Sequence, residues 1–283
     1  MITTIEIHKP LLSGEHLEAL RFQMLNESHG QHVDYSVMVY CEGKLKALFL
    51  KAEQHAPISF ENYGYALHGL SLMNFNPASH SRRKAVRQKA AGGDLVLGWL
   101  GGRKPSWEDI LQAGHRDNFS ASFFLLPLLK DCEKAIQERL PEYWEFHQRQ
   151  ALKLRRPKGE RLQTLGMVEN KWERKIVRDW DRKNRYYLFP GSKAFSTVTL
   201  NQSIPFAAHR DEHNVPGTFS CLTALGAWKG GGLCFPRLGL TFDVRPRDLL
   251  ISDTNTELHG NVGGIFGNRY SVVAYLHDTL VTA

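Results

Sequence analysis

The hydrophobic and polar positions of the N-terminal half predict a mixture of helices and strands. Apolar residues recur at helical spacing over Ser13–Asn26 and again over Phe123–Leu140, and each segment is expected to form an amphipathic helix. Between them, the apolar runs Tyr35–Cys41 and Lys46–Leu50 lie on either side of a Glu42-Gly43 turn. This arrangement is typical of two strands joined by a tight connection.

The pattern changes from Phe195 onward, where short β-rich runs alternate with glycine, proline and asparagine turns. The runs are Phe195–Leu200, Thr218–Leu225, Leu233–Phe235, Leu240–Val244, Leu249–Ser252 and Tyr270–Leu276. Short strands at this spacing are typical of sandwiches and barrels of the jelly-roll type. We therefore predict an α+β fold, in which a double-stranded β-helix (jelly-roll) core is supported by helices from the N-terminal half.

Three regions follow from this pattern. Residues 1–150 are expected to form an α/β supporting region, residues 151–194 a basic and helical segment, and residues 195–283 the double-stranded β-helix with the catalytic residues. No glycine- or proline-rich linker separates the halves, so we expect one continuous domain.

Composition excludes several classes of protein. Of the 283 residues, 42% are hydrophobic and 23% are charged, which excludes a mostly disordered or collagen-like chain. No stretch approaches the roughly 20 apolar residues of a membrane span, and no basic segment leads into an apolar run at the N-terminus. We expect an intracellular protein, in the nucleus of a eukaryote or the cytoplasm of a bacterium or infected host. Its oligomeric state is left open.

The four cysteines predict neither a zinc module nor a disulfide framework. Cys41, Cys132, Cys221 and Cys234 form no CxxC pair. We therefore expect free thiols in a reducing compartment.

The charge of +7 is concentrated in one segment. Between Ala151 and Arg185 there are 12 Lys or Arg residues and 5 Asp or Glu residues, which equals the whole excess. Basic residues here recur at helical steps and predict a positive face that contacts phosphates, and a second basic stretch lies in Ser79–Gly93. The alternative is a solvated helix with interspersed acidic residues. The candidate phosphate contacts are Arg155, Arg156, Lys171, Arg174, Lys175, Arg178, Arg82, Arg83 and Lys84.

Candidate chemistry is concentrated at His209, Asp211 and His259. Two imidazoles and one carboxylate on one face of an octahedral metal leave three positions open, as in the facial triad of non-haem iron(II) oxygenases. An H-x-D pair at the end of a strand presents two ligands, and a neighbouring strand returns the third. The chain holds a second H-x-D, His115-Arg116-Asp117, but it precedes a helical segment rather than strands. We expect that second motif to bind no metal.

Arg269 and Ser271 follow on one strand. An arginine binds a carboxylate through two parallel hydrogen bonds, and a serine on the same strand face can donate a third. This pair suits the distal carboxylate of 2-oxoglutarate. Because side chains alternate with period 2, Tyr275 and His277 share that face and are expected to line the same pocket.

These residues resemble the TET and base-J-binding-protein branch of the iron(II)/2-oxoglutarate dioxygenases. The branch's compact TET-like members are the nearest in character, because the zinc-binding cysteine-rich region of animal TET proteins has no counterpart here. The matching segments are FSTVTLN (Phe195–Asn201), HRDEHN (His209–Asn214), GGGLCFPRLGLTFDVRPRDLLISD (Gly230–Asp253), ELHGN (Glu257–Asn261) and RYSVVAYLH (Arg269–His277).

The resemblance implies a substrate and roles for further residues. It implies that iron(II) and 2-oxoglutarate serve as cofactors, with O₂ as cosubstrate and ascorbate as the reductant in an assay. It implies DNA as partner, in which the methyl group of a flipped 5-methylcytosine is oxidised to 5-hydroxymethylcytosine. Asn214, Tyr275 and His277 would contact the base. The extent of further oxidation does not follow from the resemblance.

Three alternatives remain open at this point. The same chemistry could act on thymine or an RNA base, or on a small molecule or protein side chain. The chain could also be a non-catalytic DNA-binding module on an oxygenase fold. The basic segment favours a nucleic acid over a small molecule, and the complete triad favours an enzyme.

Overall fold

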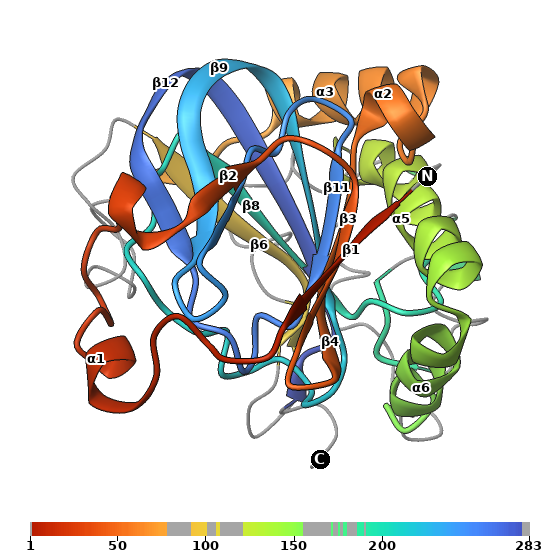
Figure 1. The fold of residues 1–283 in the computed structure, drawn as a ribbon. Helices are drawn as coiled ribbons and strands as arrows, with labels where there is room; N and C mark the ends of the chain where they lie inside the picture. Colours follow the sequence, from red (N-terminus) through yellow and green to blue (C-terminus); the bar gives the residue numbers. More distant parts are fainter. Residues whose placement is uncertain are drawn as a thin grey trace.

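The computed structural model describes residues 2–77, 92–100, 106–107, 121–154, 171, 175, 178–179, 186–189 and 191–278. Figure 1 shows the course of the chain through helices and strands. The helical elements are α1 (Gly14–Glu18), the 3-10 turn η1 (Glu27–His29), α2 (Ala52–His55), α3 (Phe60–Leu72), the 3-10 turn η3 (Phe123–Leu125), α5 (Leu126–Arg139) and α6 (Pro141–Ala151). Within the described ranges, no helix has the length and hydropathy needed to cross a membrane.

The strands run from the N-terminus almost to the end of the described chain. They are β1 (Thr3–Ile7), β2 (Gln31–Val33), β3 (Val37–Cys41), β4 (Lys44–Leu50), β5 (Asn76–Pro77), β6 (Gly93–Leu100), β7 (Ser106–Trp107), β8 (Thr197–Gln202), β9 (Ser220–Phe235), β10 (Leu240–Phe242), β11 (Leu249–Ser252) and β12 (Gly260–Tyr275).

Strands from both halves of the chain join one hydrogen-bonded sheet. Its order is β1-β3-β4-β11-β9-β12-β8-β6-β5, with β10 linking β9 to β2 and with β7 beside β6. The long strands β9 and β12 are antiparallel neighbours at its centre. N-terminal strands extend the C-terminal β-helix on both sides, since β4 pairs with β11 and β6 pairs with β8. The predicted α+β fold with a double-stranded β-helix core is confirmed. The divisions 1–150, 151–194 and 195–283 stay predictions.

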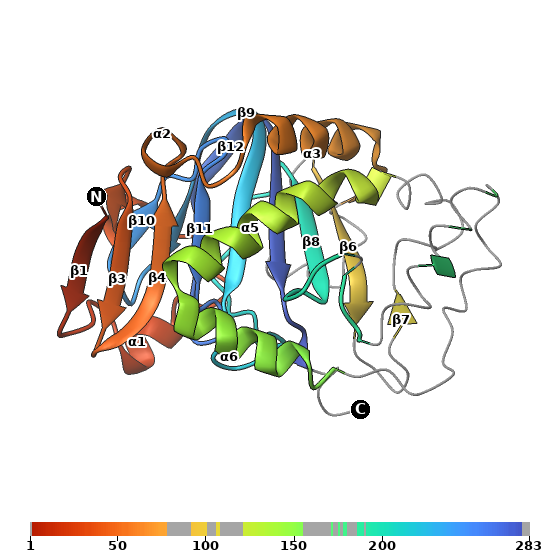
Figure 2. The ribbon, with the colours of Figure 1, turned by 90° about the vertical axis from the view of Figure 1, so that its right-hand side faces the viewer.

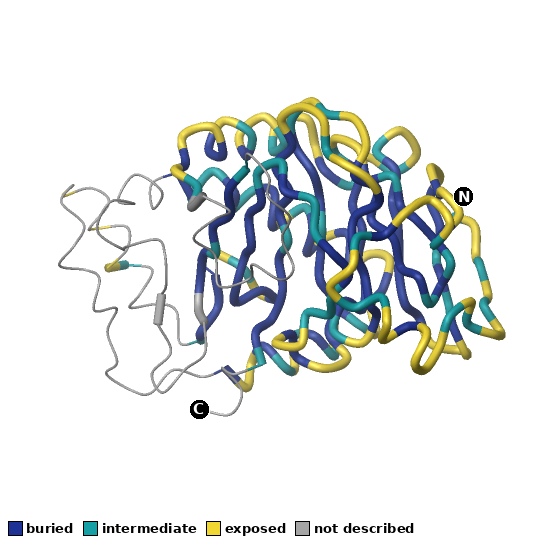
Figure 3. The backbone as a smooth tube through the Cα atoms, turned by 90° about the vertical axis from the view of Figure 1, so that its left-hand side faces the viewer, coloured by how far each residue is buried: buried dark blue, intermediate teal, exposed yellow. Residues whose placement is uncertain are grey.

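A layer of helices covers one face of this sheet, as Figure 2 shows for α3, α5 and α6. Alternate residues of β8 and β12 (Val198, Leu200, Val272 and Ala274) are buried in one core with Leu129 of α5. Because strand side chains alternate, the residues between them face away from the helices. Figure 3 shows that the central strands are buried over most of their length, while many connecting loops are exposed.

The helix predicted for Ser13–Asn26 is much shorter than expected. α1 ends at Glu18, and Phe22 adopts a left-handed backbone with φ of +64°. The Phe22 N–H donates to the Ala208 carbonyl, and the Ala208 N–H donates to the Gln23 carbonyl. These two bonds draw the chain out of the helix and along the segment that leads to His209. A tertiary contact thus overrides the local helical pattern.

The strands predicted in the regions of β9 and β12 are shorter than the strands in the structure. The predicted run Thr218–Leu225, from Ser220 onward, and the run Leu233–Phe235 belong to the single strand β9, Ser220–Phe235. Gly226 and Gly230 have φ of +108° and +75°, so the strand bends there and continues. The same bend occurs in β12, which begins at Gly260 rather than at Tyr270.

Candidate active site

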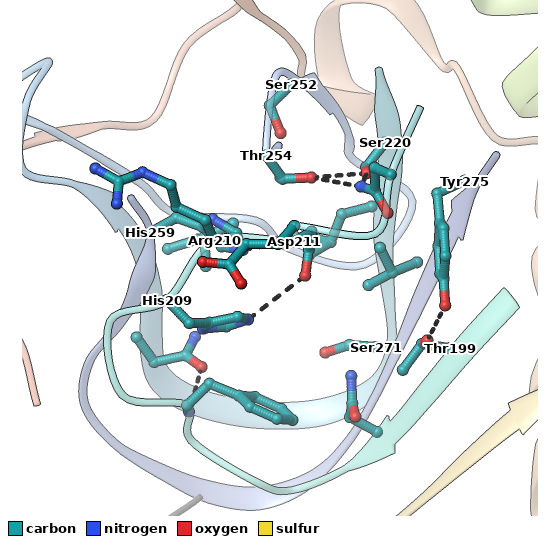
Figure 4. A pocket seen from close by; sticks show the side chains of 18 of the residues that line it. Thr199, His209, Arg210, Asp211, Ser220, Ser252, Thr254, His259, Ser271 and Tyr275 are labelled. Carbon is teal, nitrogen blue, oxygen red and sulfur yellow. Dashed lines mark hydrogen bonds and ion pairs between the residues drawn. The ribbon is translucent and has the colours of Figure 1, made fainter. Parts of the chain in front are cut away.

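The structure brings His209, Asp211 and His259 together. His209 and His259 form an antiparallel bridge in which each backbone N–H donates to the other residue's carbonyl at 2.9 Å. The carboxylate of Asp211 lies 3.7 Å from the Nε2 atoms of both imidazoles. One ligand atom from each of the three residues lies within 4.8 Å of the others. Figure 4 shows the three side chains at one end of a cavity.

Backbone carbonyls fix the orientation of both imidazoles. The Nδ1 of His209 lies 2.9 Å from the Ala207 oxygen, and the Nδ1 of His259 lies 3.0 Å from the Glu257 oxygen. A carbonyl oxygen only accepts, so each Nδ1 carries the hydrogen and each Nε2 keeps its lone pair. Two neutral imidazoles and one carboxylate are a donor set that fits a divalent iron ion.

The cavity beside this triad has a volume of about 260 Å³ and contains a buried cation. Arg269 is 3% exposed, and its Nη1 donates to the Gly231 carbonyl at 2.8 Å. Its Nε is buried and has no partner in the described part of the chain. Burial, and secondarily the nearby charge of Arg245, lowers the pKa of Arg269 to about 10, so the guanidinium remains charged at neutral pH.

A polar group near Arg269 also lacks a partner among the described residues. Ser271 lies opposite Asn201 in the β12–β8 register, and both line the cavity. The Oδ1 of Asn201 is buried without a hydrogen bond among the described residues. A buried cation and a buried amide with unused hydrogen-bonding capacity fit a polar, anionic ligand such as 2-oxoglutarate.

Gly231 is required for this arrangement. A Cβ built on Gly231 would lie 2.9 Å from the Nη1 of Arg269 and 2.5 Å from a side-chain carbon of Ile265, and the residue's φ is +70°. Only glycine leaves room for the guanidinium and adopts this backbone without strain.

The residues predicted to contact a base line the same cavity. Arg269, Ser271, Val273, Tyr275 and His277 all face it, as the strand period predicts. In Figure 4, Tyr275 stands across the cavity from the triad, with its hydroxyl 3.3 Å from the Oγ1 of Thr199.

Asn214 is adjacent to His277 and is held by two hydroxyl groups. The two residues form an antiparallel bridge. The amide nitrogen of Asn214 donates to Ser220 Oγ at 2.7 Å and to Thr254 Oγ1 at 3.0 Å. The ring of His277 stacks on His213, with centroids 5.6 Å apart and planes at 5°.

Sequence patterns missed the residues that come from the N-terminal segment. Arg21 and Phe22 line the cavity, and ion pairs Arg21–Glu212 and Arg210–Glu18 hold this segment on either side of Asp211. No local motif indicates these contacts, because the partners are far apart in the chain. A signal did exist for Asn261, which ends the quoted segment ELHGN and also lines the cavity.

The candidate phosphate contacts are only partly covered by the structure. Lys171, Lys175 and Arg178 are each helical and exposed, and their separations of four and three residues are those of side chains on one helix face. The remaining candidates and the second H-x-D motif lie outside the described residues: Arg82, Arg83, Lys84, Arg155, Arg156, Arg174 and His115-Arg116-Asp117.

Fold and site together define an iron(II)- and 2-oxoglutarate-dependent oxygenase. The model of the Tet_JBP family, the oxygenase domain of the 2OGFeDO superfamily, matches residues 127–278, which is more than half of the chain. The chain belongs to this family and is a dioxygenase. The matched region begins in α5, so it includes part of the helical layer as well as the β-helix.

Individual relatives show the same resemblance over shorter segments. Thymine dioxygenase JBP1 of Leishmania infantum is 34% identical over 92 residues, which are 30% of this chain and 11% of that protein. Bifunctional helicase and thymine dioxygenase JBP2 of Trypanosoma brucei brucei is 31% identical over 151 residues, 49% of this chain and 13% of that protein. The chain thus spans a small fraction of these relatives.

One solved structure resembles almost the whole fold. NgTET1 in complex with 5mC DNA superposes with a TM-score of 0.56 at 12% identity, over 92% of this chain and 84% of that chain. At this identity the likeness shows the fold.

Proposed function

We propose that the protein oxidises the methyl group of 5-methylcytosine in DNA, with 5-hydroxymethylcytosine as the first product. The observation that carries the proposal is one cavity that contains the triad, a buried arginine and the set Asn214, Tyr275 and His277. A ring, a polar amide and an imidazole are the groups that bind a planar base by stacking and hydrogen bonding.

Iron(II) would be held by His209, Asp211 and His259, and 2-oxoglutarate by Arg269 and Ser271. With both bound, O₂ would be activated as the oxidant of the methyl C–H bond, with one oxygen atom going to the product and the other to succinate as 2-oxoglutarate loses CO₂. The protein itself orients the metal-binding side chains and excludes water from the cavity. Carbonyl oxygens hold both Nε2 lone pairs toward the metal position. The apolar side chains of Leu222, Leu233 and Val273 line the cavity and limit water beside the reacting methyl group.

Hydrogen bonding at Asn214 favours cytosine over thymine. The amide nitrogen already donates to Ser220 and Thr254, so the amide oxygen is what remains for a substrate. An oxygen accepts from the 4-amino group of cytosine and repels the O4 of thymine. This argument supports 5-methylcytosine.

Two features support DNA as the substrate: the size of the cavity, which admits a flipped base, and the exposed basic side chains. A methyl group inside a duplex does not reach a cavity of this size, so the base must be flipped out of the stack. Lys171, Lys175 and Arg178 present exposed positive charge for phosphates. Binding through such contacts weakens steeply as salt rises.

Thymine in DNA is the second candidate. It is favoured by the curated relatives, which are thymine dioxygenases. The two bases carry the same methyl group and differ at the 4-position, where Asn214 is proposed to act.

Nucleoside mass spectrometry tests the proposal directly. The protein is incubated with iron(II), 2-oxoglutarate and ascorbate, and with matched duplexes that carry either 5-methylcytosine or thymine as the only methylated base. We expect one added oxygen on 5-methylcytosine and none on thymine. Oxidised thymine alone would establish the second candidate, and no product on either duplex would reject both.

Replacing Asn214 with alanine should reduce base discrimination more than turnover of 2-oxoglutarate. Loss of one hydrogen bond of about 1.4 kcal/mol corresponds to about a tenfold fall in the ratio of 5-methylcytosine to thymine oxidation. Succinate release without DNA should change less.

Asn255→Ala is the matched control for this variant. The Asn255 amide donates to the backbone oxygens of Asp211 and Asn214 and supports the same loop, but its side chain does not line the cavity. If Asn255→Ala alters base discrimination as much as Asn214→Ala does, Asn214 acts only by holding the loop.

A further inference from the structure

A cluster of buried charges lies directly behind the His259 ligand. Lys46 of β4 is 9% exposed, and its Nζ lies 2.9 Å from Asp253, 2.9 Å from Glu257 and 3.0 Å from the hydroxyl of Thr256. The backbone joins the same place, because the Asp253 N–H donates to the Lys46 carbonyl at 3.0 Å. One lysine thus binds three residues of the turn that leads from β11 to His259.

Glu257 is the centre of this cluster. It is 1% exposed, and its Oε1 accepts from both Lys46 and Arg237, the latter at 2.8 Å. Its Oε2 is buried without a hydrogen bond in the part of the chain that the structure describes. Burying a carboxylate and two cations costs desolvation energy that the ion pairs often only offset. A buried ion pair of this kind is therefore weak evidence for a stabilising role, which indicates that Glu257 has another role.

The backbone of Glu257 supplies that role. Its carbonyl accepts the Nδ1–H of His259, the bond that leaves the Nε2 of His259 free to bind a metal. Its N–H donates to the Asp253 carbonyl at 3.0 Å. The side chain of Glu257 is fixed by two cations, and the carbonyl of the same residue orients the ligand. Hydrogen bonds of this kind to a ligating imidazole set its orientation and its basicity.

We propose that Lys46 is a positioning residue of the metal centre, which acts through Glu257 to hold the imidazole of His259 in its metal-binding orientation. Arg237 supports the same carboxylate from the other side. This inference rests on the metal role proposed for His259 and does not depend on the identity of the substrate.

Lys51 provides a matched control. It follows β4, is 8% exposed and forms a buried ion pair with Asp248 at 2.6 Å. Its bonds reach Asp248, the Ser36 hydroxyl and the Asp243 carbonyl, and none reaches residues 253–259 of the described structure. Loss of either lysine leaves a buried aspartate or glutamate with less compensation, so both variants should lower stability. Only the loss of Lys46 should affect the metal.

The test is cobalt(II) binding to the metal-free full chain, without DNA and without 2-oxoglutarate. We expect Lys46→Met to weaken cobalt(II) affinity about 10- to 100-fold relative to wild type, the usual effect of removing an outer partner of a metal-ligating histidine. Lys51→Met should retain wild-type affinity. The visible absorption of bound cobalt(II), which reports ligand geometry, should change in Lys46→Met and not in Lys51→Met.

Several outcomes would overturn the inference. Equal cobalt(II) affinity in Lys46→Met and wild type would do so, as would equal weakening in Lys46→Met and Lys51→Met. If wild type binds no cobalt(II), the metal assignment fails and this inference fails with it; a failure confined to Lys46 leaves the proposed function intact. If Lys46→Met does not fold, Arg237→Met applies the same test from the more exposed side of Glu257, with about a tenfold loss expected.

Discussion

Replacing His209 with alanine is expected to lower oxidation of the base by more than about 1000-fold, equivalent to at least about 4 kcal/mol of activation free energy. The imidazole supplies one of three ligands, and its Nε2 lone pair is oriented by the bond from Nδ1 to the Ala207 carbonyl. Alanine offers no donor at this position. Cobalt(II) affinity should fall together with turnover, whereas binding to DNA should change little, because phosphate contacts dominate that affinity.

His115→Ala is the matched control for this prediction, because His115 begins the chain's second H-x-D motif. We expect His115→Ala to retain both cobalt(II) binding and turnover. Retained turnover in His209→Ala, or its loss in His115→Ala, would show that the metal is held elsewhere. The pair of variants therefore decides between two motifs of identical local sequence pattern.

The chemistry carried by β12 could be predicted from the sequence because it depends on local geometry. Once Arg269 faces the cavity, the strand period places Ser271 and Tyr275 on the same face, and the structure agrees. The H-x-D pair was predictable because two candidate ligands separated by one residue need only a short extended segment; the structure holds His209 in a bridge with His259, seven residues after β8, rather than at the expected strand end.

The residues around the triad could not be predicted, because their contacts join distant segments. Lys46 and Asp253 are 207 residues apart, and they meet because β4 pairs with β11 in a register that sets Ala47 opposite Ser252. Neither segment alone indicates that pairing. Phe22 is a similar case: its segment has a helical pattern, and only its bond to Ala208 ends the helix.

Residues predictable from local sequence and residues positioned by contacts beyond it differ in what they indicate about the substrate. Residues on β12 and after Asp211 line the cavity, and their types alone indicate chemistry. Contacts with neighbouring and distant segments fix the orientation of these groups, as Ser220, six residues away, and Thr254, forty residues away, do for Asn214. Family resemblance therefore indicates the reaction more firmly than the base, because under the proposed function the choice of base depends on which atoms of Asn214 remain unused.

Replacing Arg269 with methionine is expected to raise the half-saturating concentration of 2-oxoglutarate at least about 100-fold, corresponding to about 2.7 kcal/mol. The side chain is 3% exposed and charged, and its Nε has no partner among the described residues. Burial, and secondarily the charge of Arg245, lowers its pKa to about 10, because burial without a carboxylate partner disfavours the charged form. Methionine fills similar space without the charge, so the variant loses the carboxylate partner.

The buried charge of Arg269 also predicts how its replacement changes the free energy of unfolding. Because Arg269→Met removes a buried cation without a carboxylate partner, the ligand-free variant should be at least as stable as ligand-free wild type in urea unfolding. Added 2-oxoglutarate at 100 times its wild-type dissociation constant should stabilise wild type by about 2.7 kcal/mol and the variant by no more than about 0.4 kcal/mol. Arg149→Met is the control, since Arg149 of α6 is exposed and does not line the cavity. Strong destabilisation of ligand-free Arg269→Met would mean that Arg269 serves the fold rather than the cosubstrate.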